Sequence, residues 1–206
     1  MNKPIKKQIE LPGIRNITIS GRIGTGKSTL AEHLADALGW DMLDGGKIFR
    51  KIAKEMGISI IEKTKIPDEL DMEFEEKVKD MLVNQNHHIV QSHLAGFVAQ
   101  GISEVYKILV VCQDEDGEDK PSIRIDRLMN RDFLSANEAK YEIKKREEEH
   151  LNKFRRLYAN DNPNWVYWDN KFYDLVVNTF YLNQKEAVDF VLKQLSLKVI
   201  RPIALS

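Results

Sequence analysis

This 206-residue sequence contains a single cysteine, no long apolar run and almost no excess of either charge. The single cysteine, Cys112, cannot form an intrachain disulfide, and a Cys-based zinc cluster is excluded as well. It follows an apolar run, so we expect a small buried core residue there. No apolar stretch approaches the roughly 20 residues that a membrane-spanning helix needs. The N-terminal lysines precede no apolar signal-peptide core, so we expect a cytoplasmic protein that does not bind membranes.

The charge is balanced. The 31 basic and 32 acidic residues leave a formal net charge of −1. This balance gives no general electrostatic reason to bind nucleic acid, and a basic surface would have to be local. The hydrophobic share of 42% is enough for a folded core. We therefore expect one compact α/β domain over residues 1–206, with room for a small inserted lid.

Short apolar runs alternate with amphipathic stretches, as in a mostly parallel sheet flanked by helices. We expect strands at 14–20, 41–43, 88–91, 107–112 and 173–177. The spacing of apolar residues predicts helices at 28–38, 47–56, 68–83 and 185–195. The stretch 122–157, rich in Arg, Lys and Glu, fits two or three helices joined near 133–135. The acidic run 114–120 is typical of a solvated surface turn.

Residues 21–28, GRIGTGKS, fit the phosphate-binding pattern G-x-x-x-x-G-K-[ST] at every fixed position. A strand is expected before this loop and a helix after it, which is the context that the motif requires. Its glycines let backbone N–H groups turn toward phosphate oxygens, and the helix N-terminus adds partial positive charge. We expect Lys27 to reach the β- and γ-phosphates of ATP, and Ser28 to ligate Mg²⁺. The expected ATP-binding residues are Gly21, Gly24, Thr25, Gly26, Lys27, Ser28 and Thr29.

The loop alone does not identify the group that accepts the phosphate. The segment LDGGKIFR at 43–50 follows the second expected strand, at the edge where doubly wound sheets bind ligands. Arg50 could fork onto an acceptor phosphate there, although it also fits the exposed face of an amphipathic helix. Arg124, Arg127 and Arg131 share one helical face. A nearby anion would offset their repulsion, and the alternative is a solvated face paired with Glu142 and Glu147–Glu149.

Taken together, these residues resemble the cytidylate kinase family of nucleoside monophosphate kinases, and they are most similar to its short archaeal-type members. The similarity extends thinly from residue 17 to about residue 195. Its more specific stretches stand in the family's order: DGGKIFR at 44–50, PDELD at 67–71, HLAGF at 93–97, the arginines of 124–131, Arg146-Glu147, and YDLVVNT at 173–179.

The resemblance implies the P-loop NTPase fold, with a helical acceptor-binding segment at about 45–90 and a mobile lid at about 121–160. The family transfers the γ-phosphoryl group of ATP to CMP or dCMP. The implied catalytic residues, which close over the transferring group, are Lys27, Arg127, Arg131 and Arg146. The implied acceptor-binding residues are Asp44, Arg50, Asp71 and His93. Small nucleotides would be the only partners, and a monomer is expected.

The chain departs from the family's pattern on the acceptor side. Gly45 stands where the family has Ser or Thr, and Gln91-Ser92 replaces an acidic-Gly pair. His93 replaces an arginine, and it follows a buried strand at the edge where ligands bind. An acceptor phosphate beside His93 would favour the charged imidazole. The alternative is a histidine packed against Phe97 with its nitrogens bonded to backbone.

Lys77 and Lys153 stand where the family's pattern leads us to expect arginine. Lysine keeps the positive charge but cannot form the two parallel hydrogen bonds of an arginine side chain. The identity of the acceptor therefore stays open. One alternative is a small-molecule kinase with a different acceptor on the same scaffold. The other is a nucleotide-binding regulatory protein that has lost phosphoryl transfer.

Overall fold

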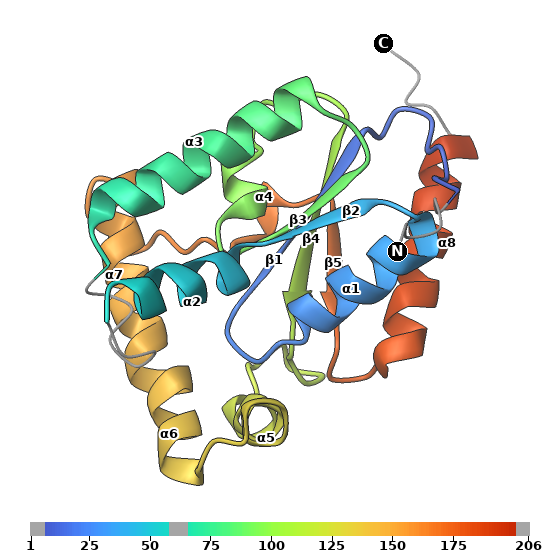
Figure 1. The fold of residues 1–206 in the computed structure, drawn as a ribbon. Coiled ribbons are helices and arrows are strands. Elements are labelled where there is room, and N and C mark those ends of the chain that lie inside the picture. Colours follow the sequence, from blue (N-terminus) through green and yellow to red (C-terminus); the bar gives the residue numbers. More distant parts are fainter. Residues whose placement is uncertain (1–6, 58–65, 201–206) are drawn as a thin grey trace, which may run out of the picture.

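A computed structural model of the chain describes residues 7–57 and 66–200, apart from the side chains of residues 132 and 198–200 (Figure 1). Residues 58–65 of the expected acceptor-binding segment lie outside the described residues, as do the two chain ends. The described part is a parallel sheet with helices on both faces, which confirms the expected α/β class.

Five parallel strands form the sheet in the order β2-β3-β1-β4-β5. Their bounds are β1 (Asn16–Gly21), β2 (Asp41–Asp44), β3 (His88–Gln91), β4 (Val105–Val111) and β5 (Leu175–Asn178). β1 is central and buried along its whole length, and its Ile17 pairs with Ile89 of β3 and Tyr106 of β4. Such a strand cannot carry exposed charge, and β1 contains no charged residue. All five strands were expected from the sequence.

Helices cover both faces of the sheet (Figure 1). They are α1 (Lys27–Leu38), α3 (Asp68–Asn84), α4 (Ala95–Val98) and α8 (Gln184–Ile200). Leu30 and Leu34 of α1 share one buried apolar cluster with Val191 of α8 and the strands. Phe74 and Val78 of α3 belong to a second cluster with α4. None of the described helices is both long and apolar enough to cross a membrane.

Helix α2 (Gly45–Glu55) follows β2 without a loop, because Asp44 at the end of the strand caps it. The side chain of Asp44 accepts a hydrogen bond from the backbone N–H of Lys47 at 2.9 Å. This cap starts the helix at Gly45, two residues earlier than the sequence predicts.

Four helical segments beyond the carboxyl ends of the strands occupy the range that was expected to form a lid, and we call this range the lid region (Figure 1). They are α5 (Pro121–Asp132), α6 (Ala136–Tyr141), the π-helical turn η2 (Glu142–Arg146) and α7 (Glu147–Tyr158). Phe133 ends α5 in the left-handed conformation, with φ of 54°. Ser135 and Glu138 then start α6 with a reciprocal capping box. The expected break near 133–135 is confirmed.

An aromatic cluster holds α7 against the body of the protein. Phe154 of α7 packs with Leu94, Trp165 and Tyr167, all of them buried. Trp165 and Tyr167 belong to the irregular segment before the short 3₁₀ helix η3 (Asn170–Phe172). Because this packing fixes α7, the lid region is attached firmly at its C-terminal end.

Candidate active site

The phosphate-binding loop joins β1 to α1 in a conformation that glycine makes accessible. Gly24 and Gly26 have φ of 77° and 93°. A Cβ on Gly24 would lie 2.7 Å from the carbonyl oxygen of Arg124, and one on Gly21 would lie 2.5 Å from that of Val110. Gly26 at the N-cap has no side chain, so the N–H groups of the first turn stay available to an anion.

Lys27 is the first residue of α1 and is only 9% exposed. Its Nζ donates to the carbonyl oxygen of Arg22 at 3.3 Å. Burial first, and then the positive charge of Arg131, lowers the pKa of Lys27 to about 7. A phosphate group beside Lys27 would reverse this effect, because a nearby anion favours the ammonium form.

Two cavities of about 530 Å³ each meet at this loop. The walls of both include Gly24, Lys27, Ser28 and Arg131. The α8 cavity continues between α1, α5 and the start of α8, and the α2 cavity continues between α2, α3 and the lid segments. Two ligands could therefore approach Lys27 from separate cavities.

Arg127 and Thr179 form one wall of the α8 cavity. Arg127 donates from Nη1 to Oγ1 of Thr179 at 2.8 Å and from Nη2 to its carbonyl oxygen at 2.7 Å. The Thr179 hydroxyl donates to the carbonyl oxygen of Thr25 at 2.8 Å. These bonds join α5, the loop after β5 and the phosphate-binding loop. Thr29 lines the same cavity.

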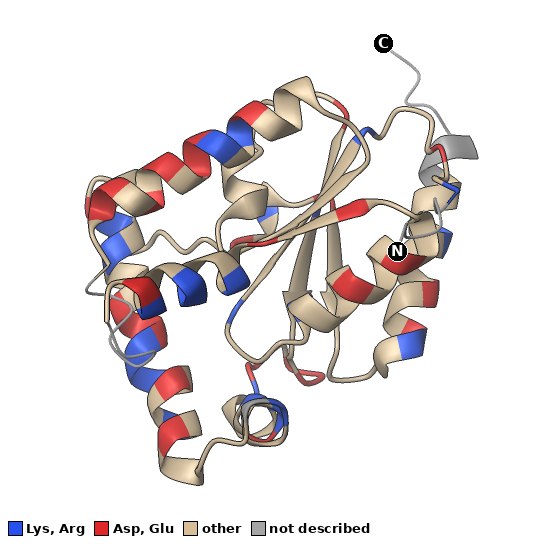
Figure 2. Ribbon diagram, in the orientation of Figure 1, with Lys and Arg blue, Asp and Glu red and all other residues tan. Residues whose placement is uncertain are grey.

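The α2 cavity brings together residues that are far apart in sequence. Besides Gly24 and Ser28, the expected site residues in its walls are Lys27, Asp44, Arg50, Asp71, His93, Arg131 and Arg146. Figure 2 shows basic residues on α2 and α5 and a mainly acidic α3, the elements that surround this cavity. Arg146 also forms an ion pair with Glu142, one turn earlier in the lid. The geometry thus places three arginines around one cavity that opens onto Lys27.

His93 lines the α2 cavity, but its Nδ1 lies against protein atoms. This nitrogen is 3.1 Å from the carbonyl oxygen of Gly21 and 3.3 Å from the hydroxyl of Tyr167. Burial first, and then the charge of Lys27, lowers the pKa of His93 well below its usual value. The imidazole is therefore neutral in the free protein and bonded to backbone. Its ring packs against Tyr167 and His150, with centroids 5.6 and 5.8 Å away.

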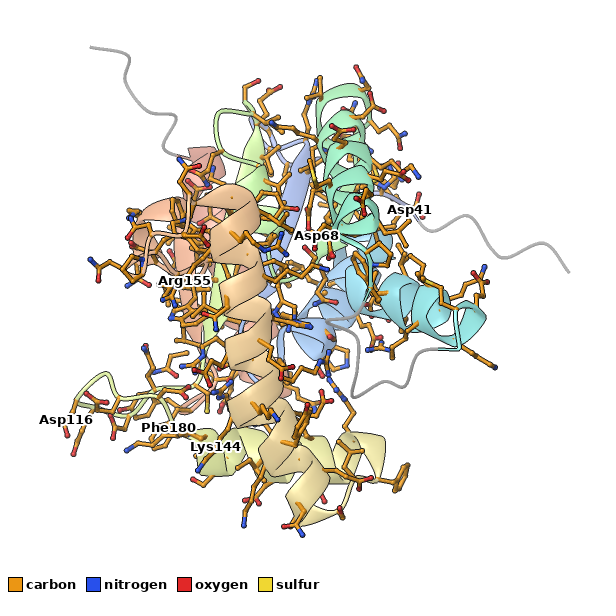
Figure 3. The ribbon with its side chains drawn as sticks, turned by 90° about the vertical axis from the view of Figure 1, so that its left-hand side faces the viewer. Asp41, Asp68, Asp116, Lys144, Arg155 and Phe180 are labelled. Carbon is orange, nitrogen blue, oxygen red and sulfur yellow. The ribbon has the colours of Figure 1, made fainter. Side chains whose placement is uncertain are left out.

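Asp71 takes part in a contact between α3 and α7. Lys153 of α7 lies 2.5 Å from Asp71 and donates to the carbonyl oxygen of Ile66 at 2.7 Å. Asp68, labelled in Figure 3 beside α7, pairs with Arg156 at 2.5 Å. The ammonium group of Lys153 thus donates to one carbonyl oxygen and lies beside two carboxylates, contacts that need no bidentate fork.

A buried charge network was not expected from the sequence. Arg124 is fully buried and pairs with Glu147 and Asp119, each at 2.8 Å. Glu147 also accepts hydrogen bonds from the Arg22 side chain and from the backbone N–H of Ile23. Arg124 is therefore neutralised by carboxylates within the protein and does not face either cavity. Sequence reasoning had offered Glu147 only as a partner on a solvated face, and it gave no signal of the burial or of the role of Arg22, which lies 125 residues from Glu147.

Three further polar groups line the α2 cavity: Glu75, which sequence reasoning missed, and Gln91 and Ser92, which it noted only as departures from the family's pattern. Within the described part of the chain, one oxygen of each side chain is buried and has no hydrogen-bond partner. Burial, reinforced by the charge of Asp71, raises the pKa of Glu75 to about 8. The only available signal for Glu75 was its position one helical turn after Asp71.

The model of the cytidylate kinase-like family matches residues 16–181. A cytidylate kinase from Sulfolobus acidocaldarius is 32% identical over 185 residues, covering 88% of this chain and 94% of that enzyme. This chain belongs to the cytidylate kinase-like family. It is accordingly a nucleoside monophosphate kinase, and the kinase family implies ATP as its co-substrate.

Solved kinases share the fold of this cytidylate kinase-like chain at low sequence identity. A gluconokinase from Sinorhizobium meliloti 1021 superposes with a TM-score of 0.55 at 15% identity, covering 93% of this chain and 96% of that one. A shikimate kinase from Acinetobacter baumannii has a TM-score of 0.50 at 18% identity, with coverages of 92% and 96%. At these identities the likeness concerns the fold, and it confirms the expected P-loop kinase architecture.

Proposed function

We propose that this chain transfers the γ-phosphoryl group of ATP to CMP or dCMP. The observation that carries the proposal is the meeting of two cavities at Lys27 and Arg131. Phosphoryl transfer requires a donor and an acceptor held in line, with charge neutralised between them. The names of the relatives, cytidylate kinases at 31–32% identity, support a cytidine nucleotide as the acceptor.

ATP occupies the α8 cavity in this proposal. The phosphates bind the backbone N–H groups of the loop and Lys27. The proposed ATP-binding residues are Gly21, Gly24, Thr25, Gly26, Lys27, Ser28 and Thr29, of which all but Gly21 and Thr25 line a cavity. Arg127 holds the loop after β5 against the phosphate-binding loop and so shapes the donor site.

The acceptor nucleotide occupies the α2 cavity. Arg50 grips its phosphate, and Asp44, Asp71 and His93 complete the walls. Arg131 and Arg146 then neutralise the transferring group together with Lys27. Because these arginines come from the lid, its closure would exclude water and limit hydrolysis of ATP.

Mg²⁺ fits the oxygen donors at the junction of the cavities. Ser28 lines both, and Asp44 is close to fully buried in the α2 cavity. Gln91 presents a buried oxygen without a partner among the described residues. Hydroxyl, carboxylate and amide oxygens suit Mg²⁺, which usually takes only one or two protein ligands beside phosphates. We propose that Ser28 holds the ion, which would offset the negative charge of the phosphates.

The proposed organisation is a single kinase domain with an acceptor-binding segment at about 45–90 and a lid at about 121–160. We further propose that it acts as a monomer in the cytoplasm. Light scattering on a sizing column tests the monomer, because a dimer would double the 23.8 kDa mass.

A coupled assay of ADP release with a panel of nucleoside monophosphates tests the proposed acceptor. We expect CMP and dCMP to be turned over in preference to UMP, AMP and GMP. Turnover only with a non-nucleotide acceptor would favour the small-molecule kinase. Binding of ATP without turnover of any acceptor would favour the regulatory protein.

A further inference from the structure

Two residues at the end of β3 present buried polar atoms to the α2 cavity. Gln91 is 2% exposed and Ser92 is 7% exposed, and both line the cavity. In the described part of the chain, the Oγ atom of Ser92 has no hydrogen-bond partner. A buried hydroxyl left unpaired destabilises a fold, so a hydroxyl kept in this position points to a ligand that pairs with it.

Gly45 lies directly against Ser92. A Cβ at position 45 would be 3.0 Å from the Cβ of Ser92 and 3.0 Å from Cζ of Phe74. Neighbours must move to admit such contacts, so a side chain at position 45 would compete with Ser92 for the same space. The next residue, Gly46, borders the guanidinium of Arg50, which would lie 3.3 Å from a Cβ there. This contact therefore lies close to the arginine assigned to the acceptor phosphate.

The departures at these two positions are complementary. The resemblance predicts Ser or Thr at position 45 and glycine at position 92, whereas this chain has Gly45 and Ser92. One hydroxyl and one glycine are present in either arrangement, on opposite sides of the same contact.

We propose that Ser92 is a positioning residue whose hydroxyl donates a hydrogen bond to the phosphate of the acceptor nucleotide. Gly45 is glycine because it makes room for that side chain. The inference rests on the proposed function, since it assigns a contact within the proposed acceptor site. No bond is made or broken at Ser92, which holds the phosphate beside Arg50.

Removal of the hydroxyl alone tests the contact. Ser92→Ala should raise KM for CMP about tenfold, as expected for one hydrogen bond to a charged group, and leave KM for ATP unchanged. Ser103→Ala is the matched control, because Ser103 is exposed and lies outside both cavities. Titration of wild type and Ser92→Ala with CMP and with cytidine, which lacks the phosphate, locates the contact. The Kd of the variant should rise only for CMP. Equal weakening of both ligands would overturn the assignment to the phosphate.

Exchange of Gly45 and Ser92 tests whether glycine at position 45 makes room for the Ser92 side chain. Gly45→Ser alone should raise KM for CMP and lower Tm, because its Cβ meets Ser92. Adding Ser92→Gly should restore much of the CMP affinity, since a hydroxyl is again present and the contact with the Cβ of Ser92 is gone, while the contact with Cζ of Phe74 remains for its side chain to relieve. The matched control is Gly45→Ala with Ser92→Gly, which relieves the same contact but supplies no hydroxyl. It should remain about tenfold weaker than the Ser-containing exchange.

Failure of the Ser92 contact and failure of the proposed function give different results in these experiments. A wild-type protein that turns over CMP, together with a Ser92→Ala variant of unchanged KM, overturns the inference and leaves the proposed function standing. The inference is also overturned if Gly45→Ser with Ser92→Gly has the same KM for CMP as Gly45→Ala with Ser92→Gly. A wild-type protein that turns over no monophosphate overturns the proposed function and the inference with it.

Discussion

Arg124 on α5 donates from Nη1 to Oε2 of Glu147 on α7 at 2.8 Å, and both side chains are almost fully buried. The same carboxylate oxygen accepts the backbone N–H of Ile23 at 3.1 Å. Glu147 therefore joins two lid helices to the phosphate-binding loop. A rearrangement of α5 or α7 at this point would disturb the loop that holds the donor phosphates.

Replacement of Glu147 by glutamine should destabilise the protein strongly. It would leave Arg124 as a buried charge paired only with Asp119, and breaking a buried pair costs about 3–5 kcal/mol. We expect Glu147→Gln to lower the free energy of unfolding by about 3 kcal/mol in urea titrations. The adjacent Glu148 is exposed, so Glu148→Gln is the control. Equal stabilities of the two variants would show that the network is not needed for the fold.

ATP binding should take up protons at Lys27. Its pKa of about 7 means that the free protein loses the Lys27 charge as pH rises above that value. Triphosphate favours the ammonium form, so affinity for ATP should fall as pH rises from about 7 to 9. Calorimetry at pH 8 in two buffers of different ionisation enthalpy measures this uptake. Lys27→Met should abolish it, and uptake that persists in this variant would contradict the assignment.

Protonation of Glu75 should make the free energy of unfolding depend on pH between the ordinary carboxyl pKa of 4.5 and a pKa of about 8. Its raised pKa means that the folded protein keeps a proton that the unfolded chain releases at lower pH. This contribution is fully present below the ordinary carboxyl pKa of 4.5 and is lost as pH rises to about 8. Glu75→Gln should flatten that part of the profile in urea unfolding. Glu76→Gln, at an exposed neighbour, should leave the profile unchanged.

Lid closure should be concentrated around α6 and η2. Phe154 and Lys153 already hold α7 to the body of the protein, whereas α6 carries little besides Ala139 in the buried core. Hydrogen exchange at 133–146 should slow when a bisubstrate analogue binds, while 151–158 should be protected with or without it. Exchange that slows equally over 122–157 would indicate a lid that moves as one unit.

The sheet and the phosphate-binding loop were predictable because local signals specify them. β1 is a short, uncharged, partly β-branched run, and the loop after it has fixed residues at fixed spacing. Helix α4 was missed because four residues are too short to show helical periodicity. The aromatic packing of Trp165 and Tyr167 on α7 was missed because it depends on tertiary contacts of an irregular segment.

Site residues that stand in sequence motifs could be predicted one by one. Contacts between two residues that are distant in the sequence could not. Lys27 and Arg50 stand in recognisable motifs, and both line the α2 cavity. Arg124 looked like the other arginines of its helix face, and the sequence offered Glu147 only as a partner on a solvated face, not as the buried partner that the structure shows. The contact between Gly45 and Ser92 likewise links positions 47 residues apart, which one sequence cannot pair.

Phosphorus NMR of the protein with ATP, Mg²⁺ and CMP tests the central claim most directly, because it identifies both products in one sample. The account predicts that ADP and CDP accumulate in equal amounts, and that Lys27→Ala, which removes the ammonium at the junction of the two cavities, forms neither. Release of ADP and inorganic phosphate without CDP, or wild-type rates of CDP formation in Lys27→Ala, would contradict it.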